Sequence, residues 1–222
     1  MLLVHGFASS FERNWREPGW VDILADEGRD VIGVDLPGHG DAPKPHDPEA
    51  YRNLADAVVA ALPAGSGQVD AIGFSLGGQL VLRVCAQHPE RFRKVVVGGV
   101  GDNLFRHDDP EPTARAIESG RIAEGDPGVA QAFAVFGKAP GNDPAALAAC
   151  LRRPRDPVSA DDLAGATVPI LVVLGDRDFA GPAGKLIDAL PDARLASLAG
   201  ADHFGTPKDF RFIEAAMDFL RD

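Results

Sequence analysis

The stretch Val69-Asp70-Ala71-Ile72-Gly73-Phe74-Ser75-Leu76-Gly77-Gly78 decides the fold of this chain. Residues 69–72 predict a strand, and residues 76–87, which stop before Pro89, predict a helix. Between them, Ser75 is the centre of a Gly-x-Ser-x-Gly pattern. In a sharp turn from strand to helix, small neighbours let the two elements approach closely and leave a strained serine with its hydroxyl exposed. Ser75 is therefore a candidate nucleophile.

Short apolar runs on both sides of this stretch are continuous rather than alternating, which is typical of strands buried on both faces. They cover residues 2–4, 31–35, 69–72, 95–97 and 170–174, with a weaker run at 194–198. Segments with helical spacing lie between them, at residues 50–62, 76–87 and 207–220. This alternation predicts an α/β fold with a mostly parallel sheet and helices on both faces. Ligands of such sheets bind beyond the carboxyl ends of the strands.

A serine nucleophile needs a base and an orienting acid, and on this kind of sheet the three follow in the order serine, acid, histidine. Of six histidines, only His203 follows the last predicted strand, in a loop at the carboxyl edge. Asp178 lies in the turn after the strand at 170–174 and is the preferred acid, because the extra residues of the turn let it reach His203. Asp176 in the same turn is less favoured, and Asp102 is the reserve candidate.

Acyl transfer also needs two backbone N–H groups that hold the negative charge of the oxyanion. Leu76, which follows the nucleophile, is expected to supply one of them. Phe7 is expected to supply the other, since it follows the first strand and the preceding Gly6 lets the backbone turn an amide inward.

Residues 101–168 break the alternation of strands and helices, because they hold helix-prone segments at 113–122, 128–136 and 144–151 but no strand. A compact domain rarely carries a structureless connection of that length. We therefore expect a small helical cap at residues 101–168, inserted in a core formed by residues 1–100 and 169–222. Apolar side chains of the cap either line a substrate pocket or form the core of the cap itself. The candidate pocket residues, from the cap and from the loops of the acid and the base, are Phe105, Phe133, Phe136, Phe179 and Phe204.

Composition limits the partners and the compartment. The chain has 222 residues, 45% of them hydrophobic, and a formal net charge of -11. This charge repels nucleic acid and anionic membranes, so we expect a small-molecule substrate as the partner. Cys85 and Cys150 lie among apolar residues, and the start of the chain lacks a basic leader, so we expect reduced cysteines and a cytoplasmic protein. No cluster of His, Cys and carboxylate has metal-ligand spacing, and we expect neither metal nor cofactor.

The ordered set of motifs resembles the α/β-hydrolase superfamily, in particular its small carboxylesterases and cofactor-free haloperoxidase-like members. The motifs span nearly the whole chain: His5-Gly6-Phe7, Asp35-Leu36-Pro37-Gly38-His39-Gly40, Gly73-Phe74-Ser75-Leu76-Gly77-Gly78, His88-Pro89-Glu90-Arg91, Val168-Pro169-Ile170, Gly175-Asp176-Arg177-Asp178 and Asp202-His203-Phe204. The resemblance implies an α/β-hydrolase fold and hydrolysis of esters or thioesters of small to medium apolar acyl groups through an acyl-enzyme. It also implies Asp178 as the acid, Phe7 and Leu76 as oxyanion donors, and a cap that shapes the acyl pocket.

One departure from the superfamily concerns the start of the chain. Members commonly have two or more strands before the His-Gly segment, whereas this sequence begins inside that strand, so the usual first strands are expected to be absent or to lie upstream. The strand at 31–35 then becomes an edge of the sheet. An uncovered edge invites pairing with another chain, and a homodimer is the resulting hypothesis.

Two other functions stay open at this point. Hydrolases of carbon–carbon bonds in ring-cleavage products use the same triad, and a hydrolase fold can also serve as a ligand-binding receptor. Haloalkane dehalogenases and epoxide hydrolases are disfavoured, because they use a carboxylate nucleophile where this chain has Ser75.

Overall fold

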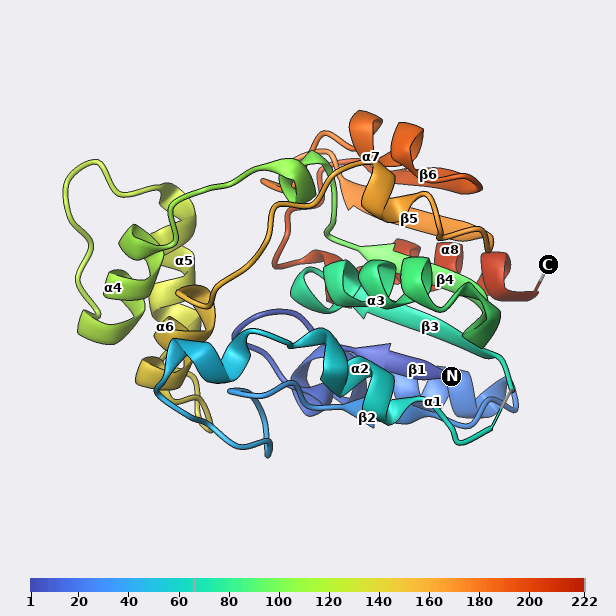
Figure 1. Cartoon of the computed structure of the whole chain (residues 1–222), viewed down its shortest axis with the longest axis horizontal. Helices are drawn as coiled ribbons and strands as arrows, with labels where there is room; N and C mark the ends of the chain where they lie inside the picture. Colours follow the sequence, from blue (N-terminus) through green and yellow to red (C-terminus); the bar gives the residue numbers. More distant parts are fainter. Residues whose placement is uncertain (66, 222) are drawn as a thin grey trace.

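The computed structural model describes residues 1–65 and 67–221. Six strands form one sheet in the order β2-β1-β3-β4-β5-β6, and every neighbouring pair is parallel (Figure 1). The strands are β1 (Leu2–Val4), β2 (Ile32–Val34), β3 (Val69–Phe74), β4 (Phe92–Gly98), β5 (Ile170–Gly175) and β6 (Ala193–Leu198). The predicted parallel α/β architecture is confirmed, and each predicted apolar run forms a strand.

The middle strands are buried on both faces, as their continuous apolar runs predict. Every residue of β3 and β5 is buried, whereas β2 and β6 at the two edges are partly exposed. β4 begins at Phe92 rather than at residue 95, because Phe92 is itself a buried core side chain. β2 is an edge strand, as expected from the sequence. Dimerisation through that edge stays a prediction, which light scattering can test.

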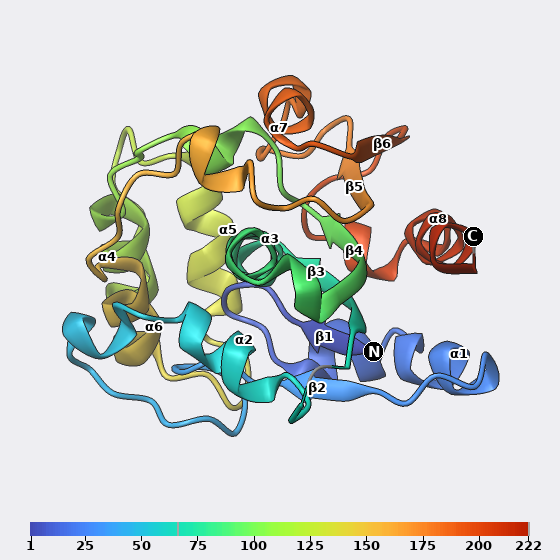
Figure 2. The same cartoon turned by 45° about the vertical axis from the view of Figure 1, so that its right-hand side comes forward.

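Helices cover both faces of the sheet (Figure 2). Those on one face are α2 (Ala55–Ala61), α3 (Leu76–Gln87) and α7 (Gly184–Ala189), and those on the other are α1 (Trp20–Asp26) and α8 (Phe210–Arg221). The helix predicted over 50–62 is divided, because Asp47 accepts a hydrogen bond from the Glu49 N–H at 3.0 Å and starts a separate short turn. α8 begins at Phe210 rather than at Pro207, which lies in a preceding 3₁₀ turn.

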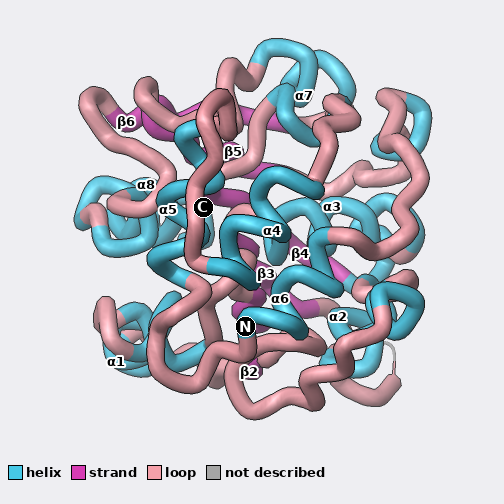
Figure 3. Tube along the Cα trace, turned by 90° about the vertical axis from the view of Figure 1, so that its left-hand side faces the viewer, coloured by secondary structure: helices cyan, strands magenta, loops and turns pink. Residues whose placement is uncertain are grey.

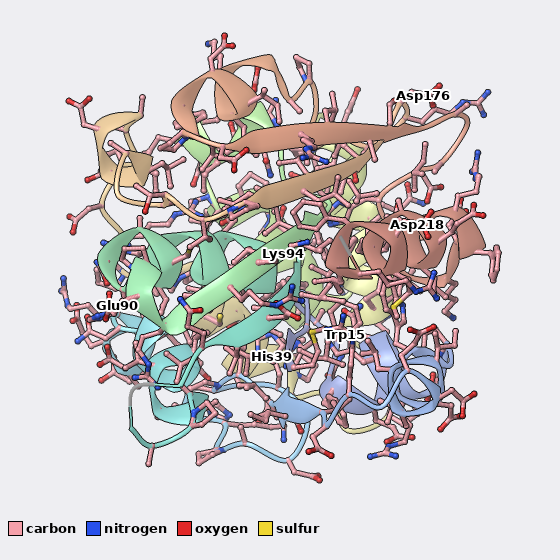
Figure 4. The ribbon with its side chains drawn as sticks, turned by 90° about the vertical axis from the view of Figure 1, so that its right-hand side faces the viewer. Trp15, His39, Glu90, Lys94, Asp176 and Asp218 are labelled. Atoms are coloured by element: carbon pink, nitrogen blue, oxygen red, sulfur yellow. The ribbon has the colours of Figure 1, made fainter. Side chains whose placement is uncertain are left out.

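Two arginines fasten α8 to the sheet through Asp70. Arg29 and Arg93 approach the same Asp70 carboxylate oxygen at 2.6 Å and 2.5 Å, and each also donates to the Leu220 carbonyl at 3.0 Å. Lys94 lies on β4 beside α8 (Figure 4), and its Nζ atom donates to the Phe219 carbonyl at 2.8 Å. These contacts satisfy carbonyls in the last turn of α8 that have no partner within the helix.

Three helices separate β4 from β5 in the chain: α4 (Glu111–Ser119), α5 (Gly128–Phe136) and α6 (Pro144–Leu151). They gather beyond the carboxyl ends of the strands, at the left of Figure 1 and in front of the sheet in Figure 3, and α4 packs against both α5 and α6. α5 and α6 have the bounds expected from the sequence, whereas α4 starts and ends earlier, before the left-handed Gly120. We call residues 101–168 the helical insertion; its separation as a cap over a distinct core stays a prediction.

Candidate active site

Ser75 lies in the sharp turn between β3 and α3. Its φ of 50° and ψ of -116° put a non-glycine residue in a strained region of backbone space. The turn needs glycine on both sides: a Cβ on Gly73 would lie 2.7 Å from the Gly78 backbone, and one on Gly77 would lie 2.3 Å from the Val4 carbonyl oxygen. The Gly-x-Ser-x-Gly pattern therefore reflects close packing of α3 on β1 and β3. The amino-terminal end of α3, directly behind Ser75, favours negative charge at that point.

His203 joins the serine to a carboxylate. Its Nε2 atom lies 2.9 Å from the Ser75 Oγ atom, and its Nδ1 atom lies 2.8 Å and 3.0 Å from the two carboxylate oxygens of Asp178. A neutral imidazole that donates its Nδ1 proton to Asp178 leaves Nε2 free to accept the serine hydroxyl proton. Both His203 and Asp178 are buried. The three residues expected from chain order are thus brought together in a hydrogen-bonded series.

The other candidate acids have different partners. Asp102 Oδ1 accepts the Leu186 N–H at 3.2 Å, and Asp176 Oδ1 accepts the Gly200 N–H at 2.8 Å. Asp178 accepts the Ala180 N–H at 2.8 Å in addition to its contacts with His203, so its carboxylate is fixed from two sides. Of the aspartates considered from the sequence, Asp178 is the one that contacts the imidazole.

The expected oxyanion donors lie on either side of the serine, one in the loop after β1 and one at the start of α3. Neither the Phe7 N–H nor the Leu76 N–H donates a hydrogen bond to another residue in the described part of the chain. The loop after β1 is held by Asn14, whose Oδ1 atom accepts the Gly6 N–H at 3.0 Å. Ala8, at the end of the loop, has a φ of 58°, which adds strain next to the donor.

Two neutral histidines support this loop from behind. Burial lowers the pKa of His5, and burial together with His5 lowers the pKa of His39 to about 3. His5 Nε2 accepts the Leu36 N–H at 3.1 Å, and the ring of His39 packs edge-on against Phe7 with centroids 5.5 Å apart. Both imidazoles are fully buried and have structural partners, which agrees with their exclusion as the base.

A cleft of about 970 Å³ opens beside Leu76, between α2 and α3 on one side and the helical insertion on the other. Leu76, Phe133 and Phe179 line it, and the Phe179 ring lies 4.2 Å from the His203 ring between centroids. Phe7 packs edge-on against Phe133 at 5.2 Å, so the insertion reaches the loop of the expected oxyanion donor. The cleft volume is at the upper end for small-molecule sites.

Not all of the expected pocket phenylalanines line this cleft. Phe136 stacks on Phe204 with ring centroids 4.8 Å apart, and Phe204 in turn contacts Phe133 at 5.5 Å. These two rings support the lining residues from outside. Phe105 packs against the core on the α3 face of the sheet and does not border the cleft, because the chain turns back toward the sheet there. Phe133 and Phe179 are the two that face the cleft.

Two residues of the site were not anticipated from the sequence. Asn14 directly precedes the buried Trp15, which is labelled in Figure 4 and packs edge-on against Trp20. Nothing in the local sequence pattern links Asn14 to Gly6. Arg153 lines the cleft but belongs to the run Arg152-Arg153-Pro154-Arg155, which has the composition of an ordinary solvated turn. Asn14 acts through its contact with Gly6, and Arg153 through its place in the cleft.

Over residues 1–65 and 67–221, no group of three or more His, Cys, Asp or Glu side chains is arranged to bind a metal ion. Within the same residues, none of the helices has the length and apolar character needed to span a bilayer. Cys85 and Cys150 are both free and buried, and burial raises the pKa of each thiol, that of Cys150 to about 11.

Comparisons with known proteins identify the family of the chain and several relatives. A model of the alpha/beta hydrolase family matches residues 1–215. The chain is 46% identical over 87 residues to the pimeloyl-[acyl-carrier protein] methyl ester esterase of Neisseria meningitidis, a match that covers 38% of this chain and 26% of that relative. It is 26% identical over 229 residues to the protein of the same name from Nitrosomonas europaea, covering 91% of this chain and 88% of the relative.

Among solved structures, a bromoperoxidase from Bacillus anthracis is similar over the whole chain. The TM-score is 0.75 at 24% identity, with 100% of this chain and 91% of that chain covered. At this identity the likeness concerns the fold. The match to the Neisseria relative spans about a quarter of that protein's length, so it carries no activity across by itself.

Proposed function

The chain belongs to the alpha/beta hydrolase family and has its fold, and from this premise we propose that it is a serine hydrolase that cleaves carboxylic esters or thioesters through an acyl-enzyme intermediate. The observation that carries the proposal is the hydrogen-bonded series from Asp178 through His203 to Ser75. A buried imidazole between a carboxylate and a serine hydroxyl is the arrangement that activates a weak oxygen nucleophile.

In the first half of the reaction, the Ser75 Oγ atom attacks the carbonyl carbon of the ester while His203 Nε2 takes the hydroxyl proton. The carbonyl electron pair moves to oxygen, and the N–H groups of Phe7 and Leu76 hold this oxyanion. Asp178 stabilises the imidazolium through its contacts with Nδ1. The oxyanion then collapses, the bond to the leaving oxygen or sulfur breaks, and His203 returns the proton to the leaving alcohol or thiol.

In the second half, water replaces the leaving group. His203 removes a proton from the water as its oxygen attacks the acyl-enzyme carbonyl, and the same two amides hold the second oxyanion. Collapse releases the carboxylic acid and returns the proton to Ser75. The strained backbone at Ser75 holds the hydroxyl at the site in both halves, so no rearrangement of the nucleophile is needed.

The cleft supports a substrate with an apolar acyl part. Phe179 offers an aromatic face next to His203, Phe133 lies 6.4 Å from Phe179 between ring centroids, and Leu76 adds an apolar side chain beside the nucleophile. Small to medium acyl groups fit this lining. The relatives named as methyl ester esterases are consistent with an ester of a carboxylic acid as the substrate class.

A fluorophosphonate probe tests the nucleophile, and a panel of p-nitrophenyl esters of increasing acyl length, set beside a vinylogous diketone, tests the bond that is cleaved. We expect labelling of the wild-type chain and no labelling of Ser75→Ala, with Ser119→Ala, on the surface of α4, as the matched control. Turnover of the diketone in preference to every ester would replace the proposal with carbon–carbon bond hydrolysis. Well-folded protein that neither reacts with the probe nor turns over any substrate would favour a ligand-binding role.

A further inference from the structure

Two neighbouring arginines after α6 have contrasting surroundings. Arg152 forms ion pairs with Glu111 at 2.8 Å and Glu118 at 2.9 Å, which tie it to α4. Arg153 has no carboxylate within 4.0 Å among residues 1–65 and 67–221. Its guanidinium donates from Nη1 to the Cys150 carbonyl at 2.7 Å, and its other N–H groups have no oxygen partner in the same part of the chain.

Arg153 is more buried than the other charged residues that border the cleft. It is half-buried and lines the cleft together with Leu76, Phe133 and Phe179. The carboxylates that border the same cleft all belong to exposed residues: Asp56, Asp108, Asp109, Asp156 and Asp162. The acidic groups therefore lie at the surface of the cleft, and none of them neutralises the guanidinium inside it.

The uncompensated charge of Arg153 bears on the pKa of two groups, its own guanidinium and the His39 imidazole. Burial lowers the pKa of Arg153, since no nearby carboxylate offsets the loss of water around the cation. After burial and His5, the charge of Arg153 also contributes to the low pKa of His39. His39 in turn packs against Phe7, the expected oxyanion donor. A partly desolvated cation without a counterion costs free energy, which a bound anion would recover.

We propose that Arg153 binds a carboxylate or phosphate group of the substrate, at a distance from the ester that Ser75 attacks. This inference rests on the proposed hydrolase function and adds to it a substrate class, esters that carry an anionic group. Arginine suits this role because its planar guanidinium donates two parallel hydrogen bonds to one oxyanion. The rings of Phe133 and Phe179 in the same cleft suit an apolar chain that joins the ester to the anion.

Because the chain has a negative net charge, binding of an anionic substrate needs a positively charged side chain at the site. At a net charge of -11, an anionic substrate is repelled at long range, and only a local interaction can retain it. Exposed charges are screened beyond about 8 Å at physiological salt, whereas an arginine inside a cleft is screened less. The other arginines that border the cleft, Arg52, Arg83, Arg106 and Arg155, are exposed, so selection for an anionic ester depends on the half-buried Arg153.

The test compares kcat/KM for paired esters that carry either an anionic or a neutral group at the end remote from the ester, with values for diesters divided by two for their two ester groups. Monoethyl esters of dicarboxylic acids from succinate to sebacate are set against the corresponding diethyl esters, and ethyl esters that end in a phosphate form a second arm. We expect the wild-type enzyme to prefer the anionic member at one chain length. The arm with the larger preference identifies carboxylate or phosphate as the natural group.

Substitution of Arg153 tests whether this side chain causes the preference for anionic esters. Arg153→Met is expected to lower the ratio of anionic to neutral kcat/KM by roughly tenfold to a hundredfold, the loss typical of a hydrogen bond to a charged group. Arg153→Lys is expected to keep part of the ratio, because it keeps the charge and loses the paired geometry. The matched control is Arg16→Met, which removes an exposed arginine outside the cleft that is paired with Glu12.

Inhibition of the unmodified enzyme tests the proposal even if an Arg153 variant does not fold. Dicarboxylates and phosphomonoesters of matched length are expected to inhibit hydrolysis of a neutral ester competitively, and diols of the same length are not. Hydrolysis of neutral esters with no anionic preference and no such inhibition would overturn the role of Arg153 and leave the hydrolase function standing. A chain that hydrolyses no ester and does not react with a fluorophosphonate would overturn the function, and the inference with it.

Discussion

The Nε2 atom of His203 lies 2.9 Å from the Oγ atom of Ser75, although 128 positions separate the two residues in the chain. Parallel strands make this contact possible, because the loops after β3 and β6 leave the sheet at the same edge. Phe74 and Phe179 flank the imidazole, with ring centroids 5.0 Å and 4.2 Å from it, and limit its movement.

Removal of the nucleophile should abolish turnover without unfolding the chain. We expect Ser75→Ala to lower kcat for a p-nitrophenyl ester by roughly a thousandfold or more, because no other group can form the acyl-enzyme. Steady-state kinetics measure the effect, and circular dichroism verifies the fold. Activity within a few-fold of wild type in Ser75→Ala would exclude Ser75 as the nucleophile.

Substitution of the acid distinguishes Asp178 from Asp102. In Asp178→Asn the amide can donate to His203 Nδ1 and favour the wrong tautomer, so we expect kcat to fall by about ten-thousandfold, as in other triads. Asp102→Asn keeps the oxygen that accepts the Leu186 N–H and should stay near wild type. Equal losses in the two variants, measured with the same ester, would contradict the assignment of the acid.

Asn14 should position the loop that carries Phe7. Its Oδ1 atom accepts the Gly6 N–H at 3.0 Å, and Asn14→Ala frees that amide and the turn around it. We expect kcat to fall on the order of tenfold with little change in KM, since the oxyanion forms only during reaction. Gln131→Ala, an exposed amide side chain on α5 that does not line the cleft, is the control. A rise in KM at constant kcat would point to substrate binding instead.

The ion pairs at Asp70 should stabilise the fold rather than the chemistry. Asp70→Asn removes the charge that Arg29 and Arg93 share, and we expect the free energy of unfolding to fall by about 2 kcal/mol, below the value for a fully buried pair because Arg93 is partly exposed. Glu27→Gln breaks an exposed pair and should cost less than Asp70→Asn. Urea denaturation measures both. Equal losses would show that burial of Asp70 has no particular effect.

Buried histidines should make stability depend on pH. The folded pKa of His39 is about 3 against an ordinary 6.5, so between these values the unfolded chain binds the extra proton. Stability is therefore retained above pH 6.5 and is lost as pH falls toward 3, by about 1.4 kcal/mol per pH unit for one histidine. Urea denaturation of wild type and His39→Gln at several pH values should show a shallower slope in the variant. Parallel slopes would exclude His39 as the source.

The sequence predicted the sheet, the insertion and the order of the reacting residues. Those predictions rest on patterns that are local, such as continuous apolar runs, Gly-x-Ser-x-Gly at the turn after β3, and His203 after the last strand. The strands and the turn at Ser75 involve neighbours within a few positions, where strand and helix periodicity act directly, whereas the base follows from chain order. The bounds of α5 and α6 follow the sequence for the same reason.

The tertiary structure decided between Asp178, which the sequence favoured, and the other two aspartates. It alone decided which phenylalanines line the cleft and which of the adjacent Arg152 and Arg153 pairs with carboxylates. Asp102, Asp176 and Asp178 all follow strands at one edge, and their separate hydrogen bonds depend on how three loops pack. Arg152 and Arg153 are adjacent in sequence, yet one reaches α4 and the other enters the cleft. Such choices depend on side-chain direction and on partners far along the chain, which composition and periodicity do not encode.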